Sequence, residues 1–125
     1  IVQEYIKNAV IHVGEQDQKI IGVYVVKETA KTVVEIMNIA VIEYLQGQGF
    51  GKQLIRHAIE ESAKRGYAFI EIGTGNTSLS QLRLYQQCGF RIVGVDFDYF
   101  TRHYEKEIYE NGLLCRDMIR LSYEL

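Results

Sequence analysis

Hydrophobic and polar positions change their period about a third of the way along the chain. Up to residue 42, short apolar runs rich in β-branched residues alternate with polar stretches, which is the pattern of strands joined by turns. The predicted strands are 10–13, 20–26 and 32–42, with polar turns at 14–19 and 27–31. Residues 1–9 have the pattern of a short helix or helix end. Three strands in a meander are the simplest arrangement of this part.

From residue 49 onward the apolar residues recur at helical spacing, with charged residues on the opposite side. This pattern predicts a helix over 49–65, and Gly66 is placed to end it, as a glycine after a helix commonly does. A second helix is predicted over 78–88. Its start carries Ser78-x-x-Gln81, which predicts a capping box.

A buried strand is predicted at 67–72, and two closing strands at 91–95 and 114–123 flank a long polar segment at 98–112. A strand–helix–strand unit joins parallel strands by a right-handed crossover. Residues 32–72 therefore predict one parallel pair in an otherwise antiparallel sheet. The expected fold class is α+β, with a mixed, mostly antiparallel sheet and helices packed on it. A chain of 125 residues is expected to form a single domain.

Composition narrows the classes of partner. Lys and Arg number 14 against 16 Asp and Glu, a formal net charge of −2 without a basic run, so no nucleic-acid partner is expected. No apolar stretch approaches the roughly 20 residues of a membrane span, and no signal peptide is visible. Cys88 and Cys115 fit neither a zinc site nor a redox pair, and as reduced thiols they indicate a cytoplasmic protein. His12, His57 and His103 are far apart and lack metal-ligand spacing, so no metal is expected.

A glycine-rich turn between a predicted strand and a predicted helix is the strongest chemical signal. It reads Gln46-Gly47-Gln48-Gly49-Phe50-Gly51-Lys52. Three glycines in five residues let the backbone approach a ligand, and the first N–H groups of a helix favour a phosphate. The turn is not a Walker A motif, because Lys52 is followed by Gln53. A dinucleotide-binding module stays as an alternative, since Glu71 follows the turn at about 20 residues, although inside its strand.

Two motifs in the right order carry a family resemblance. Gln46, Gly49 and Gly51 satisfy Gln/Arg-x-x-Gly-x-Gly/Ala, and Leu84-Tyr85-Gln86-Gln87-Cys88-Gly89-Phe90 is similar to a Leu-Tyr-x-x-x-Gly-Phe helix ending. On these residues most of the chain resembles the GNAT superfamily of acetyl-CoA-dependent N-acetyltransferases. The resemblance implies the three-layer α/β GNAT acyl-CoA N-acyltransferase fold, with helices on both faces of the sheet. It also implies that the family's N-terminal strand and first helix are missing from the printed sequence.

The same resemblance implies acetyl-CoA or coenzyme A as co-substrate, and it assigns the contacts. The pantetheine arm is expected along a strand, at Ile39, Ala40 and Val41. The pyrophosphate is expected to meet backbone N–H groups at Gln46, Gly47, Gln48, Gly49, Phe50, Gly51 and Lys52. The family's coenzyme-contacting Asn falls where Ser78 stands, with Asn76 two residues earlier, so either side chain is a candidate.

Two residues are implied for catalysis. Tyr85 matches the family's tyrosine that contacts the coenzyme sulfur and protonates the departing thiolate. Glu35 matches the interval of the catalytic glutamate in the histone-type branch, and it is expected to share a strand face with Met37 and Ile39. A water chain stays as the alternative base.

The segment from Asp96 to Glu110 interleaves acids with aromatic residues, and we expect it to border the acceptor site and attract a cationic amine. The expected function is N-acetylation of a primary amine of a small molecule or a protein, by direct attack in a ternary complex. The alternatives are a non-catalytic acetyl-CoA-binding domain and the dinucleotide module. The oligomeric state stays open, with a homodimer as one alternative.

Overall fold

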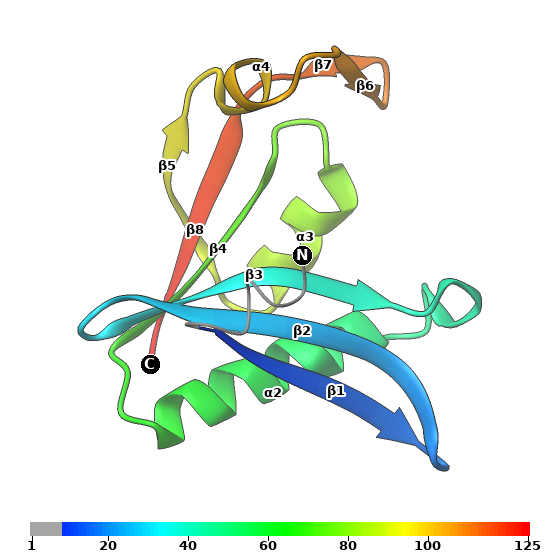
Figure 1. Cartoon of the computed structure of the whole chain (residues 1–125), viewed down its shortest axis with the longest axis vertical. Coiled ribbons are helices and arrows are strands. Elements are labelled where there is room, and N and C mark those ends of the chain that lie inside the picture. The colour runs from blue at the N-terminus through cyan, green and yellow to red at the C-terminus, as the bar shows by residue number, and fades with distance from the viewer. Residues whose placement is uncertain (1–8) are drawn as a thin grey trace. The chain divides into compact units, whose positions relative to one another are not determined.

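The computed structural model describes residues 9–125, so the helix predicted within residues 1–9 lies outside the described residues, apart from Ala9, which begins a strand. The strands are β1 (Ala9–Gln16), β2 (Lys19–Ala30), β3 (Val33–Val41), β4 (Phe69–Gly75), β5 (Arg91–Asp96), β6 (Ile108–Glu110), β7 (Leu113–Cys115) and β8 (Met118–Glu124). The helices are α2 (Phe50–Lys64), α3 (Leu79–Gln87) and α4 (Tyr99–His103), with a 3-10 turn η1 (Glu43–Leu45). Figure 1 shows these elements along the chain.

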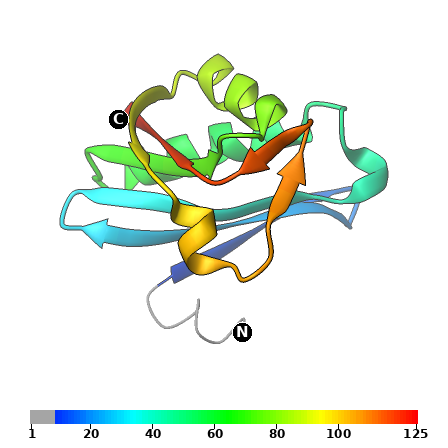
Figure 2. The ribbon, with the colours of Figure 1, turned by 90° about the horizontal axis from the view of Figure 1, so that it is seen from above.

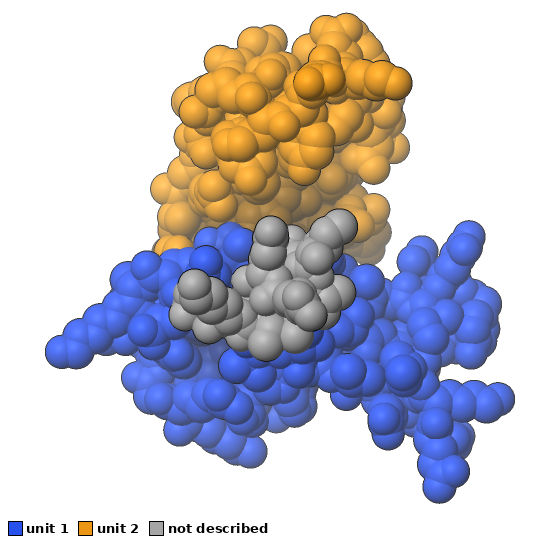
Figure 3. Space-filling view, viewed as in Figure 1, with its two compact units in different colours: residues 1–70, 124–125 blue, residues 71–123 orange. Residues whose placement is uncertain are grey.

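The chain divides into two compact units, residues 1–70 with 124–125 and residues 71–123 (Figure 3). Hydrogen-bonded strands follow the order β1-β2-β3-β4-β8-β5, and β6 pairs with β7 in a separate hairpin. The strand–helix–strand unit β3-α2-β4 gives the mixed sheet its one parallel pair, so the predicted α+β class is confirmed. Within residues 9–125, no helix has the length and apolar character that crossing a membrane requires.

In unit 1 the predicted meander is present, but its strands are longer than predicted. The first turn shrinks to Asp17 and Gln18, both with positive φ (52° and 65°), because the polar residues beside them pair in the β1–β2 ladder. The second polar stretch also stays in the ladder, where Lys27 lies opposite Glu35. Polarity alone overestimated both turns, since a strand face that meets solvent accepts polar side chains.

Helix α2 packs on strands β2 and β3, and Figure 2 shows the ribbon of this part seen from above. Its buried residues include Leu54 and Ile55, which are 5% and 0% exposed. A Cβ at Gly14 or Gly22 would lie within 2.9 Å of a Leu54 methyl carbon, so these strand glycines allow the close approach of the helix. The predicted C-terminal glycine is confirmed, since the Gly66 amide donates to the Ala63 carbonyl oxygen at 3.1 Å with φ of 87°.

In unit 2 the predicted second helix is confirmed as α3, but the long polar segment after β5 is more ordered than predicted. Residues 98–112 contain α4 and β6, and the single closing strand predicted at 114–123 is split into β7 and β8. The hairpin turn is Asn111-Gly112, both with positive φ, which is the residue pair typical of two-residue hairpin turns. That signal was present in the sequence.

Candidate active site

The turn between β3 and α2 has an open, extended course through the glycine-rich motif. Gly47 and Gly49 have φ of 81° and 86°, a region that favours glycine, and an added Cβ at either position would meet no atom within 4 Å. The side-chain amide of Gln46 donates to the Val41 carbonyl oxygen at 3.1 Å, and that of Gln48 donates to the Tyr44 carbonyl oxygen at 3.4 Å. The two glutamine side chains therefore brace the turn through hydrogen bonds to backbone carbonyl groups that precede it.

The start of α2 has unpaired donors and no negative charge of its own. The first backbone hydrogen bond of the helix runs from the Gln53 amide to the Gly49 carbonyl oxygen at 3.2 Å, so the amides of residues 50–52 have no acceptor among residues 9–125. Gly49 caps the helix without a side-chain hydrogen bond, and the first turn has no acid. Lys52 forms no ion pair in the described part of the chain. These features suit a phosphate, whose charge complements the helix dipole.

Strand β3 leads into this turn through a β-bulge that changes which side chains share a face. Asn38 lies opposite Val25 and Ile36 opposite Val26, so Met37 is the extra residue in the ladder. Ile39 consequently shares a face with Ile36, whereas Glu35 lies on the other face. The expectation that Glu35, Met37 and Ile39 lie on one face is wrong, because it assumed an unbroken two-residue period.

Tyr85 lies on the buried face of α3 in unit 2 and is 4% exposed. Burial raises the pKa of its phenol to about 12, so the group stays protonated at neutral pH. Its hydroxyl has no hydrogen-bond partner among the described residues. The Phe90 ring lies 6.4 Å from the Tyr85 ring, and an added Cβ at Gly89 would lie 2.8 Å from the Tyr123 ring. The Gly-Phe ending therefore packs the helix that holds the tyrosine.

The junction from β4 to α3 has its polar groups engaged within the protein. The Asn76 side-chain oxygen accepts from the amides of Arg116 (2.9 Å) and Asp117 (3.0 Å), and its nitrogen donates to the Leu114 carbonyl oxygen at 3.2 Å. The Ser78 hydroxyl donates to Glu110 instead of capping the helix, so the predicted capping box is absent. Sequence reasoning did not identify the buried Thr77 between them.

Ion pairs within unit 2 reduce the free negative charge of the acidic segment. Asp96 lies 2.6 Å from Arg102 and 3.5 Å from Arg120, and Asp98 lies 3.0 Å from Arg116. Three acids of the segment take part in no ion pair among the described residues; they are Glu105, Glu107 and Glu110. The attraction for a cationic amine that was expected from the whole segment is therefore limited to its second part, residues 105–110.

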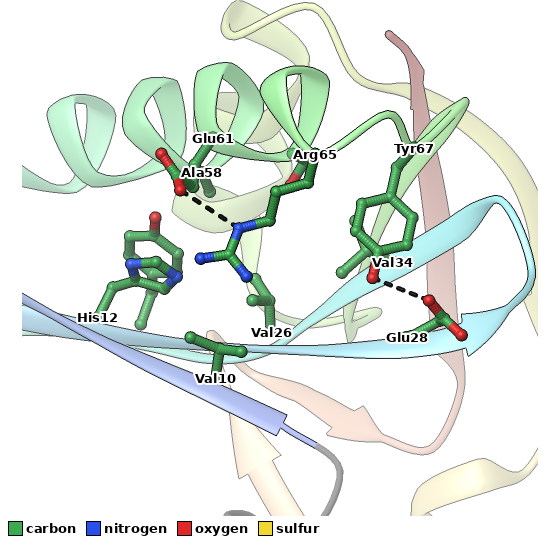
Figure 4. A pocket seen from close by; sticks show the side chains of 11 residues that line it. Val10, His12, Val26, Glu28, Val34, Ala58, Glu61, Arg65 and Tyr67 are labelled. Carbon is green, nitrogen blue, oxygen red and sulfur yellow. Dashed lines mark hydrogen bonds and ion pairs between the residues drawn. The ribbon is translucent and has the colours of Figure 1, made fainter.

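A cavity of about 90 Å³ lies in unit 1 between β1, β2 and the C-terminal half of α2 (Figure 4). Beside it the Tyr24 hydroxyl is 2.6 Å from Nδ1 of His57, and the His12 ring stacks on Tyr24. The fold brings His12 and His57 within 5.7 Å, although they are far apart in sequence. Within residues 9–125 no group of three or more His, Cys, Asp or Glu is placed to hold a metal. None of the predicted site residues lines this cavity.

Comparison with known proteins places these features in a family. The family described as "Acetyltransferase (GNAT) family" matches residues 2–90. The chain is 52% identical over its whole length to the uncharacterized N-acetyltransferase YvbK of Bacillus subtilis, of which it covers 81%.

Solved structures agree with this match. The chain is similar to an IAA acetyltransferase from Bacillus cereus, with 56% identity and a TM-score of 0.92, over 99% of this chain and 83% of that one. It is also similar to a GNAT family acetyltransferase from Elizabethkingia anophelis with acetyl-CoA bound, with 40% identity and a TM-score of 0.94, over 99% and 81%. The chain belongs to the acetyltransferase (GNAT) family and is an acetyl-CoA-dependent acyltransferase.

Proposed function

We propose that this chain transfers the acetyl group of acetyl-CoA to a primary amine by direct attack in a ternary complex. The observation that carries the proposal is the start of α2, where unpaired amides, open glycines and the absence of an acid form a site suited to a diphosphate. The amides from Gly47 to Lys52 would hold the pyrophosphate, whereas the Gln46 amide already donates to the Glu43 carbonyl oxygen at 3.2 Å. Backbone groups of Ile39, Ala40 and Val41 would hold the pantetheine amides.

We assign the remaining coenzyme contact at the β4–α3 junction to Ser78 rather than Asn76. The Asn76 amide group is occupied by three backbone partners, and freeing it would break those bonds. The Ser78 hydroxyl donates to Glu110, which leaves its oxygen able to accept a hydrogen bond.

In the chemical step a neutral amine nitrogen attacks the thioester carbonyl carbon, a C–N bond forms and the C–S bond breaks. Tyr85 donates its proton to the sulfur that leaves as a thiolate, a role that suits a buried phenol with no competing hydrogen bond. The proton that the ammonium loses before the attack passes to Glu35 or to a water chain, and the proton that nitrogen loses as the amide forms restores the Tyr85 phenol. Glu35 is half-buried in β3, which suits but does not distinguish these two routes.

The acceptor is proposed to be a cationic amine of a small molecule or a protein. The support is the stretch that leads into the hairpin of unit 2, where Glu105 and Glu107 lack ion-pair partners among residues 9–125. The acceptor panel should hold polyamines, amino acids and peptide amines. It should also hold IAA, because the Bacillus cereus relative is named an IAA acetyltransferase.

A thermal-shift screen followed by a thiol-release assay tests the proposal. Acetyl-CoA and coenzyme A are expected to raise the melting temperature and NAD is not, since a ligand stabilises the state that binds it. Thiol release should then depend on an amine and fall in Tyr85→Phe. Stabilisation by acetyl-CoA without turnover on any acceptor would favour a non-catalytic binding domain, and stabilisation by NAD alone would favour a dinucleotide module.

A further inference from the structure

Two consecutive residues at the start of α3 hold the turn of the β6–β7 hairpin. The hydroxyls of Thr77 and Ser78 both donate to the same carboxylate oxygen of Glu110, at 3.0 and 3.2 Å. The side-chain amide of the next residue, Asn111, donates to the Thr77 carbonyl oxygen at 2.8 Å. The hairpin is thus attached at its turn, by three hydrogen bonds that involve adjacent residues on each side.

Among the residues of this attachment Thr77 is buried, Ser78 is half-buried, and Glu110 and Asn111 are exposed. Thr77 is 0% exposed, so its hydroxyl depends on Glu110 for a hydrogen-bond partner away from solvent. The Glu110 carboxylate also lies at the N-terminus of α3, a helix of nine residues that has no acid in its first turn. A negative charge there complements the helix dipole. Glu110 therefore fills the place that an N-terminal acid of the helix itself would normally take.

We propose that Glu110 is a positioning residue that latches the β6–β7 hairpin onto α3 and so sets the acceptor side of the active site. The inference rests on the proposed function for its effect on the amine, and it differs from a role of Glu110 as the counter-ion of that amine. A counter-ion acts through its charge, whereas the latch acts through hydrogen bonds from Thr77 and Ser78. The acids left to attract the amine are then Glu105 and Glu107, which lie just before the hairpin.

The difference between a latch and a counter-ion sets the choice of variants. Glu110→Gln removes the charge but keeps an oxygen that accepts from Thr77. Glu110→Ala removes both, and Thr77→Val removes the buried hydroxyl at nearly constant volume. The double variant Thr77→Val/Glu110→Ala measures the coupling between the two residues. Glu107→Ala is the control for hydrogen exchange only, because this acid next to the hairpin has no hydrogen bond to α3 and only a 3.4 Å contact from the Tyr109 hydroxyl.

Steady-state kinetics of the whole chain should separate KM for the amine from KM for acetyl-CoA. We expect Glu110→Ala and Thr77→Val each to raise KM for the amine about 5–10-fold, with the double variant no worse than the worse single variant. In Glu110→Gln the KM for the amine should stay within about twofold of wild type, as should kcat and KM for acetyl-CoA in the Glu110 and Thr77 variants. The latch is overturned if Glu110→Gln is as impaired as Glu110→Ala while Thr77→Val is unaffected, because the charge would then act on the amine directly.

Hydrogen exchange gives a readout that needs no turnover. Amides of residues 106–115 should exchange about tenfold faster in Glu110→Ala and Thr77→Val, and at the wild-type rate in Glu110→Gln and Glu107→Ala. Unchanged exchange in Glu110→Ala would reject the latch. If no acceptor turns over in the wild type, the proposed function fails, and the exchange experiment still decides whether the latch exists.

Discussion

Two junctions lead from a strand into the longer helices α2 and α3, from β3 and from β4, and neither helix has an acid in its first turn. At α2 the turn is open, its glycines face empty space and the amides of residues 50–52 have no described partner. At α3 the residues before the helix are bound to the hairpin, and Glu110 supplies the negative charge. One junction suits an anion from outside, and the other is completed by the protein.

The comparison shows how similar local structure acquires different roles. Both helix starts have the same dipole and the same need for acceptors. What differs is whether another part of the chain meets that need. The junction before α2 can therefore bind a ligand at little structural cost, whereas at the junction before α3 a ligand must displace existing hydrogen bonds unless it donates to the Ser78 oxygen. Substitutions that add a carboxylate at the first junction, or that remove hydrogen bonds at the second, test this difference directly.

The largest expected effect is on kcat, and it comes from Tyr85 in α3, the helix that follows the second junction. Tyr85→Phe should lower kcat about 100-fold, because removal of a general acid has effects of that order. The Kd of acetyl-CoA should change less than about twofold, since the pyrophosphate site is at the other junction. Pre-steady-state thiol release and calorimetric titration measure the two quantities. Wild-type kcat in this variant would remove Tyr85 from the mechanism.

The same variant also changes stability at alkaline pH. Burial raises the pKa of folded Tyr85 to about 12, above the value near 10 expected when unfolded. The stabilising contribution is fully present below pH 10 and is lost as the pH rises through 12, because the unfolded chain ionises first. Two pKa units correspond to about 2–3 kcal/mol at most. Between pH 9 and pH 11.5 the free energy of unfolding, measured with urea, should fall less in Tyr85→Phe than in wild type.

The next effect comes from placing an acid in the open junction. Gly49→Asp should weaken acetyl-CoA binding about 30-fold, because its carboxylate would occupy the amides and repel the diphosphate. Gly49→Asn is the control, since Asn tolerates the same positive φ and caps a helix without a charge. Calorimetric titration should show that Gly49→Asn binds acetyl-CoA much more tightly than Gly49→Asp does. Equal affinities would mean that the start of α2 does not bind the phosphates.

A smaller effect, on the free energy of unfolding, is expected when side-chain hydrogen bonds are removed from the β4–α3 junction. Asn76→Ala removes three side-chain hydrogen bonds to the chain around Arg116 and should lower the free energy of unfolding by about 2–3 kcal/mol. Gln46→Ala at the open junction removes one, at 3.1 Å on an exposed side chain, and should cost less than about 1 kcal/mol. Urea midpoints at pH 7 compare the two, and equal losses would contradict the difference between the junctions.

The smallest effect lies beside the cavity at the far half of α2. Burial, followed by the charges of His57 and Arg65, lowers the pKa of His12. A depressed pKa contributes stability above the unfolded value of 6.5, and this is lost as the pH falls through the folded value. His12→Phe keeps a ring on Tyr24, so its melting temperature should fall about 1–3 °C less than that of wild type between pH 7.5 and 5.5. Identical pH profiles would exclude His12 as the source.

The proposed acetyl-CoA site was predictable from the sequence because its signals are local. Helical periodicity predicted α2 within one residue at each end, and the glycine-rich motif fell between β3 and α2 as expected. The spacing from Tyr85 to Gly89 and Phe90 placed the tyrosine on the second helix, where it is buried. Backbone conformation and side-chain period depend on residues a few positions apart, so a single sequence carries them.

Only the tertiary structure decided which polar groups are already satisfied. The bulge at Met37 moved Glu35 and Ile39 to opposite faces, and nothing in the local sequence marks it. Asn76 and Glu110 have side chains of the kinds that bind ligands. In the structure, however, these side chains form hydrogen bonds with residues more than 30 positions away in the sequence. Glycine-rich turns are specified by their own backbone, whereas the availability of a side chain depends on the distant residues that folding brings to it.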